Sequence, residues 1–116
     1  MPALSDDKEF ASYVVDLMQS MGPVYSKVMF GGHGIFLDAL MFGLIADSVL
    51  YLKVDTETVN SFKARGLDAF TYEKKGKPFK MLYYQAPDEA LEDSEEMNIW
   101  ANKAYAVALN ASSRNK

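Results

Sequence analysis

The residues with the clearest chemical potential lie in the stretch VMFGGHGIFLD, residues 28–38. Gly31, Gly32 and Gly34 surround His33, the only histidine in the chain. Glycine-rich segments bind phosphate when they open a helix whose N-terminal amides point at the ligand. Here a strand-like run, IFLD, follows instead, and neither G-x-G-x-x-G nor a terminal G-K-[ST] is present. The segment is therefore interpreted as a turn or bulge, where φ is positive or another backbone approaches closely.

His33 is also a candidate for catalysis, with Asp38 or Ser26 as candidate partners. A catalytic histidine needs an orienting carboxylate and a nucleophile close in space. A small-ligand or catalytic site at this glycine turn is one alternative interpretation, and it predicts a concave pocket that holds His33 and at least one acid. One histidine and no cysteine lack the nitrogen and sulfur ligands that zinc prefers. We expect no catalytic residues, no metal and no cofactor.

Lysines gather in the stretch KKGKPFK, residues 74–80, which has the composition of a hairpin tip. Cationic side chains beside aromatic rings suit a nucleic-acid backbone and its bases, so weak nucleic-acid binding is a second alternative. A lysine-rich tip also keeps the edge of a sheet soluble, and this interpretation is favoured over direct nucleic-acid binding. The predicted interaction surface for a protein partner consists of Lys74, Lys75, Lys77, Lys80 and Tyr84.

Charge and composition exclude several classes of protein. The formal net charge of −4 provides no overall attraction to nucleic acid. Residues 88–96, DEALEDSEE, hold six of the sixteen acids, which suit a solvated helix start better than a calcium loop. The absence of cysteine excludes a disulfide scaffold. No apolar run approaches the roughly 20 residues needed to cross a bilayer, so we expect no membrane association.

Hydrophobic periodicity predicts the elements that position these residues. Ser5 is a plausible N-cap for a first helix, which Gly22 and Pro23 would end. Four short strand-like runs follow within residues 24–54, and Asp55 then caps a short helix. The runs FTYEK and FKMLYYQ flank the lysine-rich tip. A final helix follows, with a predicted apolar face that consists of Met97, Trp100, Ala101, Ala104 and Ala108.

The predicted order of elements is therefore α-β-β-β-β-α-β-β-α. Grouped antiparallel strands with a few helices indicate an α+β fold of two layers. We expect one antiparallel sheet of about six strands, with three helices packed mainly on one face. The chain is interpreted as a single domain over residues 1–116, with a core of about residues 5–111.

Three phrases carry a resemblance to a known family. KVMFGGHGIFLD, LMFGLIADSVLYLKVD and AFTYEKKGKPFKMLYYQAPDEALEDSEEMNIWA stand in this order and span most of the chain, about residues 8–110. They resemble the N-terminal domain of the TfoX/Sxy family, which regulates natural competence. The resemblance implies a secretion-chaperone-like α+β domain in a bacterial cytoplasmic protein. In two-domain members a helical C-terminal domain of DNA-binding type follows. Because this sequence ends near residue 116, we expect a stand-alone copy of the N-terminal domain.

The resemblance also implies a function. Family members act in competence gene expression together with the cyclic-AMP receptor protein, and no catalytic residue is carried over from them. We therefore expect a non-enzymatic protein-interaction domain that regulates transcription, with the transcription machinery as a partner. Sheet edges and exposed aromatic rings favour pairing between copies, so a homodimer is a further alternative that the sequence does not decide.

Overall fold

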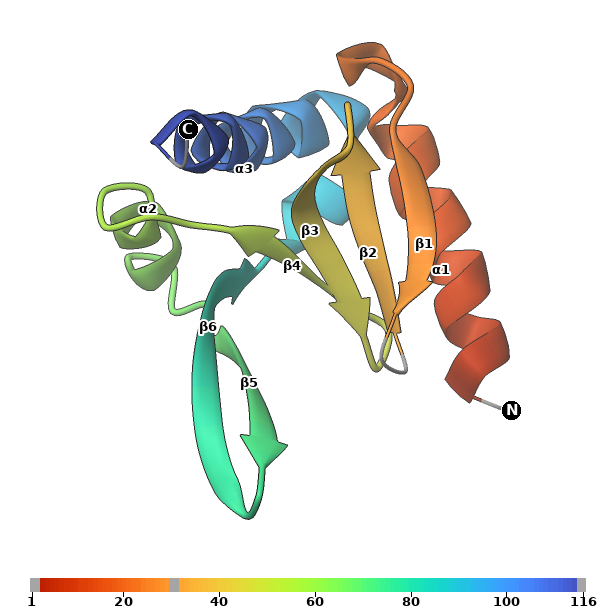
Figure 1. The fold of residues 1–116 in the computed structure, drawn as a ribbon. Helices are drawn as coiled ribbons and strands as arrows, with labels where there is room; N and C mark the ends of the chain where they lie inside the picture. The colour runs from red at the N-terminus through yellow and green to blue at the C-terminus, as the bar shows by residue number, and fades with distance from the viewer. Residues whose placement is uncertain (1–2, 30–31, 115–116) are drawn as a thin grey trace.

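The computed structural model describes residues 3–29 and 32–114 of the chain (Figure 1). The elements are α1 (Ala3–Leu17), η1 (Gln19–Met21), β1 (Tyr25–Met29), β2 (Gly32–Leu37), β3 (Leu40–Ala46), β4 (Val49–Lys53), α2 (Val59–Lys63), β5 (Ala69–Lys74), β6 (Lys77–Gln85), η2 (Asp88–Leu91) and α3 (Ser94–Arg114). The predicted order of helices and strands is confirmed, and the structure adds two short 3-10 helices, η1 and η2.

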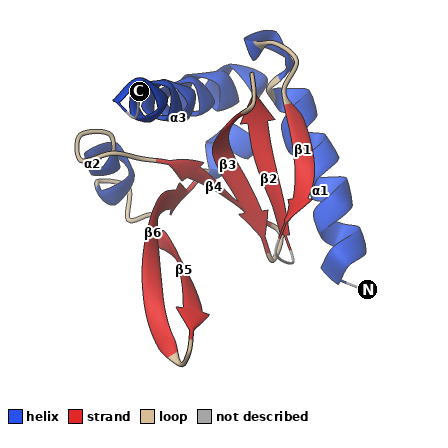
Figure 2. Cartoon of the chain, in the orientation of Figure 1, coloured by secondary structure: helices blue, strands red, loops and turns tan. Residues whose placement is uncertain are grey.

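The six strands of the described residues form one antiparallel sheet in the order β1-β2-β3-β4-β6-β5 (Figure 2). Strands β1 to β4 are a meander, as the short polar turns predicted. Strand β6 pairs with β4 only over Tyr83–Gln85. The rest of β6 pairs with β5 in a hairpin that projects away from the helices (Figure 1).

Two-residue turns of positive φ close three of the hairpins. These turns are Asp38-Ala39, Asp47-Ser48 and Lys75-Gly76. Positive φ at both central residues is the type I′ geometry, which matches the right-handed twist of the paired strands. The turn predicted at Asp47-Ser48 is confirmed.

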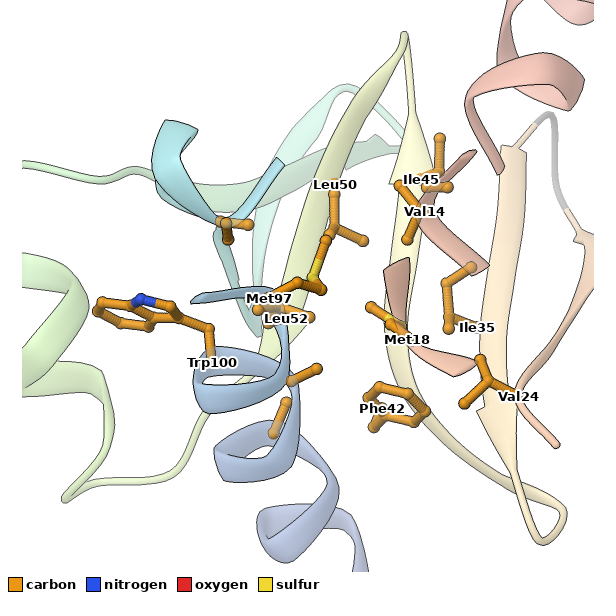
Figure 3. Close-up of a cluster of buried hydrophobic side chains, with 14 of the residues drawn as sticks. Val14, Met18, Val24, Ile35, Phe42, Ile45, Leu50, Leu52, Met97 and Trp100 are labelled. Carbon is orange, nitrogen blue, oxygen red and sulfur yellow. The ribbon is translucent and has the colours of Figure 1, made fainter. Parts of the chain in front are cut away.

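Helices α1 and α3 cover one face of the sheet and build the core against it (Figure 3). The sheet contributes Ile35, Phe42 and Ile45, each at most 1% exposed, while α1 contributes Val14, and Met18 follows directly after its last residue. Burying a side chain of this size stabilises the fold by about 1.5–3 kcal/mol. The predicted apolar face of α3 is confirmed, because all of its residues are buried: Met97, Trp100, Ala101, Ala104 and Ala108.

A buried carboxylate ties α1 to the turn between β3 and β4. Asp7 is 3% exposed, and its Oδ1 accepts hydrogen bonds from the Ser48 backbone N–H at 2.7 Å and from Ser48 Oγ at 3.0 Å. Helix α1 begins at Ala3, so the prediction of Ser5 as its N-cap is wrong. The preference of serine for an N-cap is worth only about 1 kcal/mol, so residue type alone does not fix where a helix begins.

The predicted turn is wrong for Gly32, His33 and Gly34. Gly32, His33 and Gly34 all lie in strand β2, neither glycine has positive φ, and Gly31 lies outside the described residues. The predicted close approach of another backbone is confirmed at Gly32, where a Cβ atom would stand 2.2 Å from the backbone oxygen of Ile45. Only glycine fits against a neighbouring strand at that distance.

Candidate functional site

His33 is a buried strand residue and not the loop histidine that the sequence suggested. It pairs with Val28 of β1 and Ile45 of β3, and it is 6% exposed. Alternation along β2 places its ring on the same face as Ile35, towards the helices. The Nδ1 atom of His33 is buried without a hydrogen-bond partner among the described residues.

The candidate catalytic partners of His33 are not assembled around it. Ser26 lines the same shallow hollow as His33, between α1 and β1, together with Lys8 and Ser12. Asp38 follows the far end of β2, where its Oδ2 accepts a hydrogen bond from the Tyr105 hydroxyl at 3.0 Å. Among the described residues no carboxylate lines this hollow, so the pocket expected for a catalytic histidine lacks its acid.

The face of the sheet opposite the helices contains a second hollow, which we call the open-face groove. Its volume is about 330 Å³. Strands from across the sheet contribute its apolar lining: Met29, Met41, Leu44, Phe70, Met81 and Tyr83. Gly34 also lines it, and a Cβ atom there would stand 2.7 Å from Met29 Sδ, 2.8 Å from the Phe36 ring and 3.3 Å from Met41 Sδ. The groove exists because a bare backbone lies beneath the methionine side chains.

Among the described residues, Lys53 and His33 are the basic residues that line the open-face groove, and alternation along β2 points the His33 ring to the other face of the sheet. Lys53 of β4 lines the groove, and its Nζ lies 5.1 Å from the centroid of the Tyr83 ring. In residues 3–29 and 32–114, no carboxylate lines the groove or forms an ion pair with Lys53. Burial raises the pKa of Tyr83 to about 12, so its hydroxyl is neutral at physiological pH.

The predicted lysine surface lies at the tip of the β5–β6 hairpin. Lys75, Lys77 and Lys80 are exposed, and Lys75 forms the turn with Gly76. The backbone of Lys74 pairs with Lys77, while the side chain of Lys74 lies outside what the structure describes.

Tyr84 does not belong to an exposed surface. It is 5% exposed, and its ring lies 6.2 Å from that of Phe62 in the core. Among the side chains of the hairpin that the structure describes, the large apolar ones that are exposed are Tyr72, at 41%, and Leu82, at 63%. Adjacent strand residues point to opposite faces, but the sequence does not show which of Tyr83 and Tyr84 faces the helices.

The sequence also did not reveal the open-face groove. Its lining residues are separated along the chain and belong to β1, β2, β3, β4, β5 and β6. The available signal was the spacing of Tyr25, Lys27 and Met29, which are two residues apart and so share one face of a strand. This spacing does not show which other strands contribute side chains to that face.

Two searches of the described residues bear on the kind of site. No cluster of three or more His, Cys, Asp or Glu side chains suited to a metal ion is found there. In the same part of the chain, no helix combines the length and the hydrophobicity needed to span a membrane.

A family profile matches most of the chain. The profile of the family described as the TfoX N-terminal domain matches residues 16–108, from within α1 to within α3. The match therefore includes the whole sheet, both hollows except Lys8 and Ser12, and the lysine tip. No curated protein matches the chain significantly.

Proposed function

The chain belongs to the TfoX N-terminal domain family, and on this premise we propose that it is a non-enzymatic interaction domain whose β5–β6 hairpin binds an acidic surface of a protein partner. The regulation of competence-type gene expression is the process in which we place it. The partner then belongs to the transcription machinery. The single observation that carries the proposal is the projection of a cationic hairpin from an acidic protein (Figure 1).

Charge complementarity selects the partner. Residues 69–85 contain four lysines and one glutamate, whereas the chain as a whole has a net charge of −4. Complementary charges speed the encounter of two proteins and exclude wrong partners. Leu82 is two residues from Lys80 on β6, so both point to the same side of the strand. The hairpin thus combines lysines with an exposed apolar side chain, as binding surfaces do.

The surroundings of His33 support a non-enzymatic protein. The imidazole has Ser26 in its hollow but no orienting acid among the described residues. A serine and a histidine without such a group lack the arrangement that activates a nucleophile. The arrangement of the candidate site therefore favours binding over chemistry.

A charge-reversal experiment tests the proposal. The double variant Lys75→Glu/Lys77→Glu changes two exposed lysines at the hairpin tip. The matched control is Lys8→Glu/Lys27→Glu, which makes the same change in net charge on α1 and on β1, the opposite edge strand of the sheet. Binding to the purified cyclic-AMP receptor protein and to RNA polymerase is measured by calorimetry. We expect the hairpin variant to weaken binding to one of them by at least about tenfold, and the control to preserve it.

Three results would refute this proposal. The first is the absence of binding to either partner, and the second is equal affinities for the two double variants. The third is binding to nucleic acid, which phosphate contacts make strongly dependent on salt. A salt-titrated gel shift that gives a complex with the unaltered chain and none with Lys75→Glu/Lys77→Glu would assign the hairpin to nucleic acid instead.

A further inference from the structure

We propose that the open-face groove binds small apolar carboxylates, with the hydrocarbon part packed on the methionines and the carboxylate paired with Lys53. This site lies on the sheet and not at the tip of the hairpin, so it does not depend on the function proposed above. The inference rests on the shape of the groove, on its apolar lining and on its single unpaired charge.

The size of the groove fits a small molecule. Ligand pockets in proteins generally have volumes of about 300–1,000 Å³, and the groove has about 330 Å³. A stable protein–protein interface needs about 800 Å² from each partner, far more than one hollow of this size supplies. The depth depends on Gly34, because a larger residue would displace the Met29 and Met41 side chains that rest above it.

The lining of the groove suits a hydrocarbon group of variable shape. Met29, Met41 and Met81 come from three different strands, β1, β3 and β6. Methionine is flexible and polarisable, so it adapts to irregular apolar ligands. The rings of Phe70 and Tyr83 add rigid apolar surface. Removing apolar area from water stabilises a complex by about 25 cal/mol per Å², so even partial filling of the groove favours binding.

The charge of Lys53 selects an anion. Its ammonium group lies over the Tyr83 ring at the groove, and the described residues offer it no carboxylate. A cation partly removed from water beside apolar surface gains from an anionic ligand more than a fully exposed one does. An alkyl or aryl carboxylate satisfies both features, because it combines one negative charge with an apolar body.

Matched probes test both parts of the proposal on the full chain. Octanoate and 1-octanol share their hydrocarbon chain and differ in the charged group. Binding is followed by NMR of ¹³C-methyl methionine, because three methionines line the groove while Met18 and Met97 are buried in the core. We expect octanoate to shift the methyl signals of Met29, Met41 and Met81, to leave Met18 and Met97 unchanged, and to bind more tightly than 1-octanol.

Substitution of Lys53 tests the role of the charge. In Lys53→Met we expect octanoate affinity to fall about fivefold or more, the effect of a modest ion pair, while 1-octanol affinity stays within twofold. The control is Lys27→Met, which removes a lysine on the same face whose Nζ lies 5.8 Å from the Phe36 ring and which does not line the groove. This control should bind octanoate as the unaltered chain does.

Three outcomes would overturn the proposal. Octanoate shifts that miss the three groove methionines would place the ligand elsewhere. Equal affinities for octanoate and 1-octanol, or an unchanged ratio in Lys53→Met, would remove the carboxylate from the recognition. The hairpin variant Lys75→Glu/Lys77→Glu should keep octanoate binding, so failure of the interaction proposal and failure of this one are distinguishable.

Discussion

The two faces of the sheet are built from different residues and are covered differently. On the face that α1 and α3 cover, Ile35, Ile45 and Leu52 are at most 1% exposed (Figure 3). On the opposite face, Met29, Met41 and Phe70 are only partly buried around a hollow. Close packing of branched side chains favours one rigid arrangement, whereas flexible methionines permit several. The covered face therefore forms the core, and the open face is where we propose that a ligand binds.

Removing a ring from each face tests this comparison most strongly. Phe42 is fully buried, and its ring meets that of Tyr105 edge-on at 5.7 Å. We expect Phe42→Ala to lower the free energy of unfolding by about 3–5 kcal/mol, since it leaves a cavity in the core. The matched change Phe70→Ala on the open face should cost only about 1 kcal/mol. Urea unfolding measures both, and equal losses would contradict the division between the faces.

Two glycines of β2 test how closely each part of the sheet is packed. In Gly32→Ala the new Cβ would meet the backbone oxygen of Ile45, which cannot move without disturbing the β2–β3 pairing. We expect a loss of stability of about 3 kcal/mol, at the upper end of overpacking effects.

In Gly34→Ala the Cβ would meet the sulfur atoms of Met29 and Met41 and the edge of the Phe36 ring, which are side-chain atoms and can yield more easily than a paired backbone. The expected loss of stability is about 1 kcal/mol, the lower end of the same range. Thermal unfolding of the two variants side by side provides the measurement. A larger loss for Gly34→Ala than for Gly32→Ala would show that the side chains of the open-face groove yield less than the paired backbone of β3.

Alkaline pH provides the smallest test, and it concerns the open face alone. Burial raises the pKa of Tyr83 from its ordinary value of 10.0 to about 12 in the folded chain. The unfolded chain therefore loses this proton first, so the contribution of Tyr83 is complete below pH 10 and disappears as the pH rises towards 12. We expect Tyr83→Phe to reduce the loss of stability over this interval.

The control for the alkaline test is Tyr25→Phe, because Tyr25 is 42% exposed on the same face of the sheet. This variant should lose stability between pH 10 and pH 12 as the unaltered chain does. Identical alkaline unfolding curves for Tyr83→Phe and the unaltered chain would show that the Tyr83 ring is not held away from water.

Local sequence patterns predicted much of the fold. The apolar face of α3 could be read from the spacing of Met97, Trp100 and Ala104, because helical periodicity repeats within a few residues. The turn at Asp47-Ser48 was predicted for the same reason, since both residues favour turns locally. Such features depend on neighbours in the chain and not on the assembled sheet.

The neighbouring glycines explain why the sequence did not reveal that His33 lies in a strand. Strand alternation is recognised from side chains, and Gly32 and Gly34 have none, so a strand was interpreted as a turn. The packing of β2 against the backbone of Ile45 is what requires Gly32. That contact is between residues of two different strands, so the hydrophobic pattern around Gly32 does not indicate it.

The amino-acid sequence by itself determined the order of the elements, the α+β class, the family and the cationic hairpin tip, because periodicity, turn residues and charge are properties of neighbouring residues. Only the tertiary structure decided that Tyr84 faces the core and that Lys53 lines the same groove as Met29, Met41 and Met81. The physical reason is that these contacts join strands distant in sequence, and their geometry depends on the register and curvature of the whole sheet.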